Sequence, residues 1–352
     1  MKIGIYILLF LMLSIQAIAN TETDKQLAKE KSIEAVKLID ARKFDSGIKL
    51  LQDAVKLDPT NSKIVYQMAI AYYQKLDIEK SQLIFEKLLK MHTLLPEYYQ
   101  AYSILLEDVN QIQKALNVLD IGIKKFSEAG ILYLQKGTIY AAQKKYNSAI
   151  NCFEKGIDAE PLLAANYYYA AKLYCYSNEE VWGMIYGEIF MNLERNSKRT
   201  TEISKLLFDT YKSEIKFTTD STTAVSFSKF VSIKNDELSN VAIYEPTLMQ
   251  ALIGTKALNI NTLDKVRTKF LDIYYENKYP LKFNNILFQF QKEIKDAGHF
   301  EAYNHWLLYK GNETDFTIWQ LKNKEKWEKF IEWYKSHKLE INNNNKFVRF
   351  KY

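Results

Sequence analysis

Residues 130–163 read GILYLQKGTIYAAQKKYNSAINCFEKGIDAEPLL, and this stretch contains two helical patterns joined by one short turn. The first helix is expected over residues 131–145. Tyr146 is expected to open the second helix, and Pro161 to stop it, because a proline cannot continue a helix. The stretch therefore predicts a pair of helices that pack antiparallel.

The same pattern recurs every 34 residues along the first half of the chain. Pro59 and Pro161 lie 102 residues apart, which is three times 34. Two columns at this spacing hold only small residues, whereas small residues take roughly a fifth of positions on average. The first small column is Gly47, Ser81, Ala115, Ala149 and Gly183, and the second is Ala35, Ala69, Ser103, Gly137 and Ala171. Large residues fill two further columns: Leu51, Phe85, Leu119 and Phe153, and Leu38, Tyr72, Leu106, Tyr140 and Tyr174.

These columns have a direct physical meaning. Small residues are expected where the axes of two paired helices come closest, and large residues fill the gap between one unit and the next. A single unit cannot bury its own apolar face, so the units must stack on one another.

The pattern resembles the tetratricopeptide repeat family. The family series of small, aromatic, Ala, Phe, Ala and Pro positions is matched by Gly137, Tyr140, Ala149, Phe153, Gly156 and Pro161. The resemblance implies an all-α fold, a right-handed α-solenoid of five helix-turn-helix repeats. The repeats span 28–61, 62–95, 96–129, 130–163 and 164–197. Repeat three lacks an aromatic residue in its second helix, and repeat five has Gly187 where a large residue is expected.

Composition agrees with a helical protein. Gly and Pro together account for 16 of 352 residues, about 5%, against roughly 12% on average. So few turn-forming residues argue against a β-sandwich or a barrel. The sequence contains neither G-x-G nor G-K-[ST], which removes the usual dinucleotide and P-loop fingerprints.

The first 19 residues have the features of an export signal. A basic start, Met1-Lys2, precedes an apolar run from Ile3 to Leu13, and Ala17-Ile18-Ala19 forms an A-x-A cleavage site. We expect cleavage after Ala19 and a bacterial periplasmic or secreted location. An uncleaved membrane anchor is the alternative, although the apolar run is short for a span. No later segment is apolar enough to cross a bilayer.

The charge pattern argues against a nucleic-acid partner. The net charge of +6 arises from 48 basic and 42 acidic residues that are well mixed, whereas a nucleic-acid binder concentrates its basic residues. Lys124-Lys125 and Lys144-Lys145 are only modest clusters and are expected on solvated helix faces.

The second half carries no recognisable repeat. A helix from about Ser197 to Ile215 is expected to cap the repeats, so that the solenoid domain spans 20–215. The Ser/Thr-rich segment 216–236 is expected to be a linker, and 237–340 a helical C-terminal domain. Its expected helices cover 237–254, 262–277, 281–297, 300–310 and 324–338. The tail, 341–352, is expected to be loosely ordered, although Phe347, Val348 and Phe350 offer a short docking strand.

No constellation in the sequence supports catalysis, a cofactor or a metal. The best metal candidate is Glu301 with His305, which would share a helix face four residues apart, but no H-E-x-x-H or C-x-x-C accompanies them. An ordinary polar helix end is the favoured interpretation. Cys152 and Cys175 are expected on antiparallel helices with an axial offset that prevents a disulfide, so we predict that both are free.

The resemblance implies a binding surface on the first helix of each repeat, which lines the concave face in this family. It places there a mainly aromatic and apolar set: Tyr66, Ile70, Tyr73, Gln100, Ile104, Leu134, Thr138, Tyr168, Lys172 and Tyr176. Tyrosine suits recognition because it offers a large contact area and a hydroxyl. The alternative is that some of these tyrosines only pack against the C-terminal half. The family's carboxylate clamp needs paired Lys and Asn, and only Lys172 is present.

The sequence thus predicts an exported, non-enzymatic scaffold that binds a protein or peptide segment, either in this groove or along the Trp-rich second half. A role in envelope or periplasmic assembly follows from the export signal and the family analogy. The alternative is an envelope protein that binds a small ligand or a glycan, since exposed aromatic residues also stack on sugars. Neither the partner nor the oligomeric state can be identified from the sequence.

Overall fold

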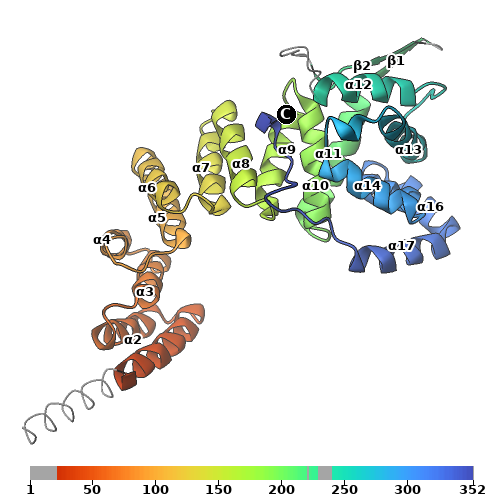
Figure 1. The fold of residues 1–352 in the computed structure, drawn as a ribbon. Coiled ribbons are helices and arrows are strands. Elements are labelled where there is room, and N and C mark those ends of the chain that lie inside the picture. Colours follow the sequence, from red (N-terminus) through yellow and green to blue (C-terminus); the bar gives the residue numbers. More distant parts are fainter. Residues whose placement is uncertain (1–21, 220–221, 229–239, 352) are drawn as a thin grey trace, which may run out of the picture. The chain divides into compact units, whose positions relative to one another are not determined.

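The computed structural model describes residues 22–219, 222–228 and 240–351 (Figure 1). The expected export signal lies outside the described residues. The chain forms two compact units, Met1–Phe126 and Ser127–Tyr352. The boundary therefore falls between the third and fourth repeats, and not at the linker expected near residue 216.

The first unit consists of three helix pairs. In each pair a short turn joins two helices, as the 34-residue pattern predicts. A helix over residues 22–40 pairs with α2 (Phe44–Leu57), α3 (Ser62–Gln74) with α4 (Ile78–Leu88), and α5 (Pro96–Asp108) with α6 (Ile112–Lys125).

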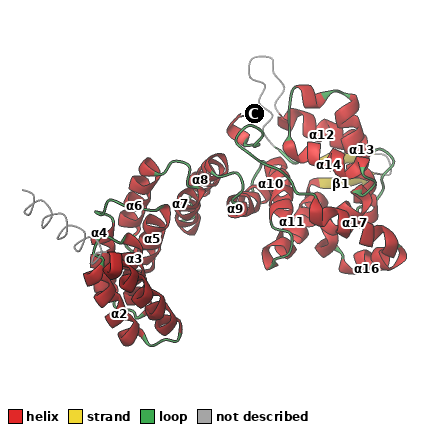
Figure 2. Ribbon diagram, turned by 60° about the horizontal axis from the view of Figure 1, so that its bottom comes forward, coloured by secondary structure: helices red, strands yellow, loops and turns green. Residues whose placement is uncertain are grey.

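The second unit begins with the two remaining repeats. They are α7 (Gly130–Ala142) with α8 (Tyr146–Ala159), and α9 (Ala164–Cys175) with α10 (Glu180–Leu193). The predicted start of the second helix at Tyr146 is confirmed. Helices make up most of the ribbon in both units, and the two strands lie in the second unit (Figure 2). The prediction of five helix-turn-helix repeats followed by further helices is confirmed.

The two small columns meet each other inside the helix pairs. The Ser81 hydroxyl donates a hydrogen bond to the backbone carbonyl of Ala69 at 2.8 Å. A Cβ atom on Gly47 would lie 3.0 Å from the carbonyl oxygen of Ala35. A larger side chain in either column would push the two helices apart, which explains why these columns hold only small residues.

Four of the turns inside the repeats share one backbone conformation. Arg42, Leu76, Asn110 and Lys144 are spaced 34 residues apart, and each has a positive φ between 56° and 67°. The next N–H in each turn reaches the carbonyl five residues earlier, as in Asp77 to Tyr72 at 2.9 Å and Lys145 to Tyr140 at 2.9 Å. This is the Schellman type of helix end, so the backbone itself sets the angle between the paired helices.

The segment expected to be a linker is structured where it is described. After α11 (Lys198–Glu214), β1 (Ile215–Thr219) pairs antiparallel with β2 (Thr222–Val225). Phe227 is fully buried against Tyr211 and Tyr244, each with ring centroids 5.8 Å away. Threonine-rich segments favour strands as well as loops, and here apolar residues between the threonines anchor the hairpin. Residues 229–239 of the expected linker lie outside the described part.

The rest of the second unit is helical. The helices are α12 (Asn240–Ala251), α13 (Ile260–Glu276), α14 (Ile286–Asp296), α15 (Phe300–Leu308), α16 (Glu313–Lys322) and α17 (Lys324–Ser336). Helix α16 was not predicted, because its sequence lacks a clear apolar face. Pro280 lies in the short 3-10 turn Tyr279–Leu281 ahead of α14, rather than at the start of that helix.

The C-terminal tail is packed, which corrects the expectation of a loose segment. Phe347 and Val348 are fully buried, and the Phe347 ring stacks on Trp182 of α10 with centroids 5.6 Å apart. The last turn, Arg349–Lys351, is a 3-10 helix and not a strand. These apolar side chains anchor the tail to the fourth and fifth repeats.

Candidate binding surfaces and the polar interior

The predicted binding residues of the first unit lie on α3 and α5. Tyr73 on α3 donates a hydrogen bond to the carboxylate of Asp108 at the end of α5. This hydrogen bond is the main reason that the pKa of Tyr73 is raised to about 12, and burial adds to it. The Tyr73 hydroxyl thus stays protonated at neutral pH and ties the two helices together.

The other four predicted residues of this unit are half-buried. Tyr66 stacks on Tyr98 with ring centroids 4.9 Å apart and also meets Phe85 edge-on. Ile70, Gln100 and Ile104 complete the set. We call the surface formed by Tyr66, Ile70, Tyr73, Gln100 and Ile104 the α3–α5 face. It is mainly aromatic and apolar, and part of each side chain remains exposed.

In the fifth repeat the predicted residues are already engaged by α11. Tyr168 is buried and donates a hydrogen bond to Glu202 at 2.5 Å. The Lys172 ammonium lies 2.6 Å from the same carboxylate. These two residues therefore pack the capping helix against the repeat, which is the alternative role considered for such tyrosines.

The remaining predicted residues are separate from this cluster. Leu134 and Thr138 are half-buried on α7, and the Thr138 hydroxyl donates to the backbone carbonyl of Gln135 in its own helix. Tyr176 follows the last residue of α9, and 80% of it is exposed. The structure thus distributes the predicted set among an exposed face on α3 and α5, a packed cluster on α9 and one isolated tyrosine.

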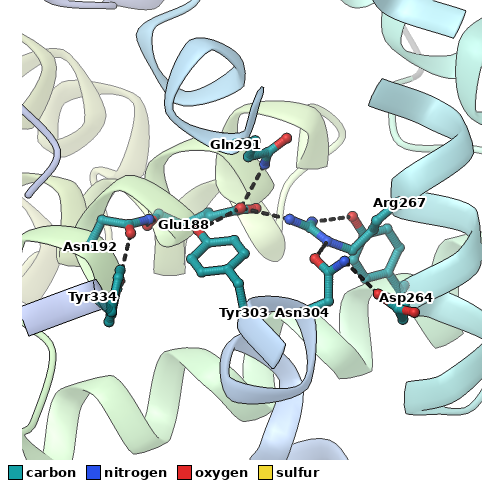
Figure 3. A network of polar contacts seen from close by, with 9 residues as sticks. Glu188, Asn192, Asp264, Arg267, Gln291, Tyr303, Asn304 and Tyr334 are labelled. Atoms are coloured by element: carbon teal, nitrogen blue, oxygen red, sulfur yellow. Dashed lines mark hydrogen bonds and ion pairs between the residues drawn. The ribbon is translucent and has the colours of Figure 1, made fainter. Parts of the chain in front are cut away.

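A buried polar network joins the fifth repeat to the C-terminal helices (Figure 3). Its centre is Glu188 on α10, only 3% exposed. One oxygen of this carboxylate accepts hydrogen bonds from Arg267 at 2.6 Å, Gln291 at 2.6 Å and Tyr303 at 2.8 Å. The three donors come from α13, α14 and α15, so a single side chain connects α10 to three helices.

The network continues on both sides of Glu188. Arg267 Nε donates to Asn304 at 2.7 Å, and the Asn304 amide donates to Asp264 at 2.8 Å. On the other side, the Asn192 amide donates to the Tyr303 hydroxyl at 2.8 Å, and the Tyr334 hydroxyl donates to Asn192 at 2.7 Å. These groups satisfy one another, which suits a structural lock rather than a reaction centre.

The cavity beside this network is small. It has a volume of about 20 Å³ and is lined on its polar side by Glu188, Arg267 and Gln291. A cavity of this size holds about one water molecule. It offers no room for a substrate. The sequence analysis missed this lock, although a lone glutamate within the otherwise apolar stretch of α10 signals a buried, paired charge.

The Glu301–His305 pair is occupied by protein contacts. The two ring nitrogens of His305 lie 2.8 Å from the Glu301 backbone carbonyl and 3.0 Å from the Asn261 side chain. The ring also stacks on Trp319 at 4.0 Å, and the Trp319 indole donates to the Glu301 carboxylate. In the described ranges no three His, Cys, Asp or Glu residues come together in a way that could hold a metal.

Both cysteines are buried and free, as the offset between their helices predicts. Burial raises the pKa of the Cys175 thiol to about 12. Cys175 is therefore a packing residue and not a nucleophile. Among the described helices, none is both long enough and apolar enough to cross a membrane.

Comparison with known proteins places the repeats in a family. Residues 131–161 match the tetratricopeptide repeat family model. No curated protein matches the chain. Three solved structures illustrate what the fold is similar to. PilF of Pseudomonas aeruginosa is 14% identical over 54% of this chain and 86% of its own, with a TM-score of 0.46. PilW, a type IV pilus biogenesis factor, is 17% identical over 53% and 86%, with a TM-score of 0.43. MamA of Desulfovibrio magneticus RS-1 is 18% identical over 49% and 97%, with a TM-score of 0.39.

Proposed function

We propose that this chain, whose first half is built from tetratricopeptide repeats, is a non-enzymatic scaffold that binds a protein or peptide segment on the α3–α5 face. The observation that carries the proposal is the contrast between two sets of equivalent positions. On α9, Tyr168 and Lys172 are held by Glu202 of α11. On α3 and α5, the equivalent side chains stay partly exposed.

The chemistry of the α3–α5 face suits an apolar or aromatic segment. Tyr66 is held in place by stacking on Tyr98, and Tyr73 by its hydrogen bond to Asp108. Aromatic side chains that are already ordered lose little entropy on binding. Ile70 and Ile104 add apolar area whose burial would drive association.

The proposal includes export and a place in the bacterial envelope, where the protein would take part in assembly. Support comes from the basic start, the apolar run and the A-x-A site within residues 1–19. Mass spectrometry of the chain recovered from the periplasmic fraction is expected to show an N-terminus at Asn20. A chain that retains Met1 and stays in the cytoplasm would contradict the export part of the proposal.

Site-specific photo-crosslinking tests the binding face directly. A photoreactive phenylalanine analogue replaces Tyr73 in one full-length protein and Tyr176 in another. Because Tyr176 is highly exposed but lies in the second unit, it serves as the matched control. We expect a discrete cross-linked partner at position 73 and none at position 176.

A mutational measurement completes the test. Affinity capture with the full chain identifies the partner, and the paired change Ile70→Ala and Tyr73→Ala is expected to weaken its binding by at least about tenfold, as loss of central anchors does. Tyr176→Ala should leave binding unchanged. If the double variant binds normally, the α3–α5 face is not the site.

A further inference from the structure

A separate cleft lies in the second unit, away from the buried network and from every predicted binding residue. Its volume is about 560 Å³, within the range of roughly 300–1,000 Å³ that small-ligand sites occupy. One wall is the connection from α10 into α11, and the other comes from α15 to α17. The lining residues are Arg195, Asn196, Ser197, Lys198, Thr200, Thr201, Trp306, Tyr309, Phe316 and Trp327.

The second wall is aromatic and well ordered. Phe316 packs edge-on against Trp327 with ring centroids 5.4 Å apart, and against Tyr309 at 5.6 Å. Trp306 packs edge-on against Tyr334 at 5.0 Å. These contacts hold the rings in place before any ligand arrives.

The indole N–H of Trp306 lacks an acceptor. Trp306 is only 8% exposed, yet within the described part of the chain no group accepts a hydrogen bond from its N–H. The nitrogen is not among the buried polar atoms that are cut off from solvent, and the side chain lines the cleft. A buried tryptophan N–H normally finds an acceptor, so this donor is available to a ligand in the cleft.

The first wall is cationic and carries no acidic side chain. Arg195 donates its hydrogen bonds to the backbone carbonyls of Asn192, Tyr334 and His337. Lys198 is exposed, and in the described ranges no carboxylate pairs with it or with Arg195. By contrast, the neighbouring Arg199, which does not line the cleft, is paired with Glu194.

The start of helix α11 strengthens the positive potential of this wall. The helix is 17 residues long and begins at Lys198, and Ser197 caps it through the N–H of Thr200. The N-terminus of a helix carries a partial positive charge and favours anions. Two uncompensated cations and a helix start therefore face four aromatic rings across one cleft.

We propose that this cleft binds the C-terminal residue of a peptide whose last side chain is aromatic. The carboxylate lies toward Lys198 and the start of α11, and the aromatic ring lies among Trp306, Phe316 and Trp327. A carbonyl or carboxylate oxygen of the ligand accepts the Trp306 N–H. This site is independent of the α3–α5 face, so either one can fail without the other.

Titration of the full-length mature chain tests the site. The probe is the pentapeptide Ala-Gly-Ser-Ala-Phe with a free C-terminus, and calorimetry measures its binding. Two comparison peptides are the same sequence with a C-terminal amide and the same sequence ending in alanine. We expect saturable binding of the first peptide, and at least about tenfold weaker binding of the other two.

Variants connect that binding to the cleft. Lys198→Gln is expected to weaken the free-carboxylate peptide about three- to tenfold and to reduce its sensitivity to salt. Lys205→Gln, on the same helix but outside the cleft, should have no effect. Trp327→Ala should abolish binding, and thermal unfolding of that variant checks that it is folded. Because Lys198 is exposed, its variant remains informative even if Trp327→Ala does not fold.

Nuclear magnetic resonance of the indole ¹⁵N–H groups reports on the contact itself. The signal of Trp306, assigned by its loss in Trp306→Phe, is expected to shift on addition of the peptide. The signal of Trp182, which stacks on Phe347 away from the cleft, should not move. Equal binding of the amide, no saturation below about 5 mM, or competition by an oligosaccharide or by inorganic phosphate as strong as by the peptide would each overturn the proposal.

Discussion

Arg349 and Glu154 are 195 residues apart in sequence, yet Nε of Arg349 donates a hydrogen bond to the Glu154 carboxylate at 3.0 Å. Glu154 is almost fully buried on α8 and also accepts hydrogen bonds from Tyr174 at 2.9 Å and Tyr186 at 3.1 Å. The end of the chain thus completes a polar cluster inside the fourth and fifth repeats. The tail is part of the repeat structure and not an appendage to it.

Removal of the Arg349 side chain is expected to destabilise the second unit. Arg349→Ala should lower the free energy of unfolding by about 1–3 kcal/mol, because Glu154 remains buried with only its two tyrosine donors. Urea unfolding followed by circular dichroism measures this change. Lys338→Ala, at an exposed position before the tail, is the control and should change stability little. Equal stability of both variants would show that the tail contributes nothing to the repeats.

The buried lock around Glu188 provides a second prediction. Arg267→Met is expected to cost about 3–5 kcal/mol, because it leaves the Glu188 carboxylate buried without its cation. Adding Glu188→Gln should recover part of that loss, since the uncompensated charge disappears. Thermal unfolding of the single and double variants measures the coupling. Additive losses would contradict the assignment of Glu188 and Arg267 as a pair.

Two buried tyrosines in α9 should respond in opposite directions to the loss of a hydroxyl. The Tyr167 hydroxyl is buried without a hydrogen-bond partner, whereas the Tyr174 hydroxyl donates to Glu154. Tyr167→Phe is therefore expected to raise the free energy of unfolding by up to about 1 kcal/mol, and Tyr174→Phe to lower it by about 1–2 kcal/mol. Urea midpoints of the two variants, measured in parallel, check the difference in sign.

Leu76 occupies the left-handed position of its turn and is 80% exposed. Leu76→Gly is expected to stabilise the first unit by about 0.5–1 kcal/mol, because the relief of the left-handed conformation exceeds the entropy cost of glycine. Leu83→Gly, which removes an exposed leucine from the interior of α4, should destabilise the protein instead. The same change of sign in both variants would be inconsistent with the turn geometry.

Thiol reactivity tests the interior of the fifth repeat. With the pKa of Cys175 raised to about 12 by burial, its thiolate fraction at pH 8 should be lower by about a thousandfold than in the unfolded chain. Labelling with a thiol reagent in native buffer should be correspondingly slow and should become rapid in denaturant. Rapid labelling of the native protein would mean that α9 and α10 open readily.

The repeats could be predicted from sequence because their rule is local and recurs. A glycine at 47 and an alanine at 35 already indicate a close helix approach, and the same pair of positions repeats every 34 residues. The helix starts after the turns follow from the same spacing. Tyr146, predicted to begin the second helix of repeat four, does begin it.

The second unit could be predicted only in outline, because its contacts join distant residues. Glu188 meets Arg267 across 79 positions and Tyr303 across 115, and no periodic pattern signals such pairs. The Ser/Thr-rich segment was interpreted as a linker because composition alone does not show that Phe227 finds a pocket between Tyr211 and Tyr244. The roles of Tyr168 and Lys172 depended in the same way on Glu202, a residue of the following helix.

The shared turn at Arg42, Leu76, Asn110 and Lys144 has a practical consequence. Because backbone hydrogen bonds hold this turn, four chemically different side chains occupy it without changing its shape. Both native cysteines are buried, so a cysteine introduced at these positions would take a fluorophore selectively. A donor at Asn110 and an acceptor at Lys144 would place one dye in each compact unit. Energy transfer between them would then act as a molecular ruler for movement of one unit against the other when a partner binds.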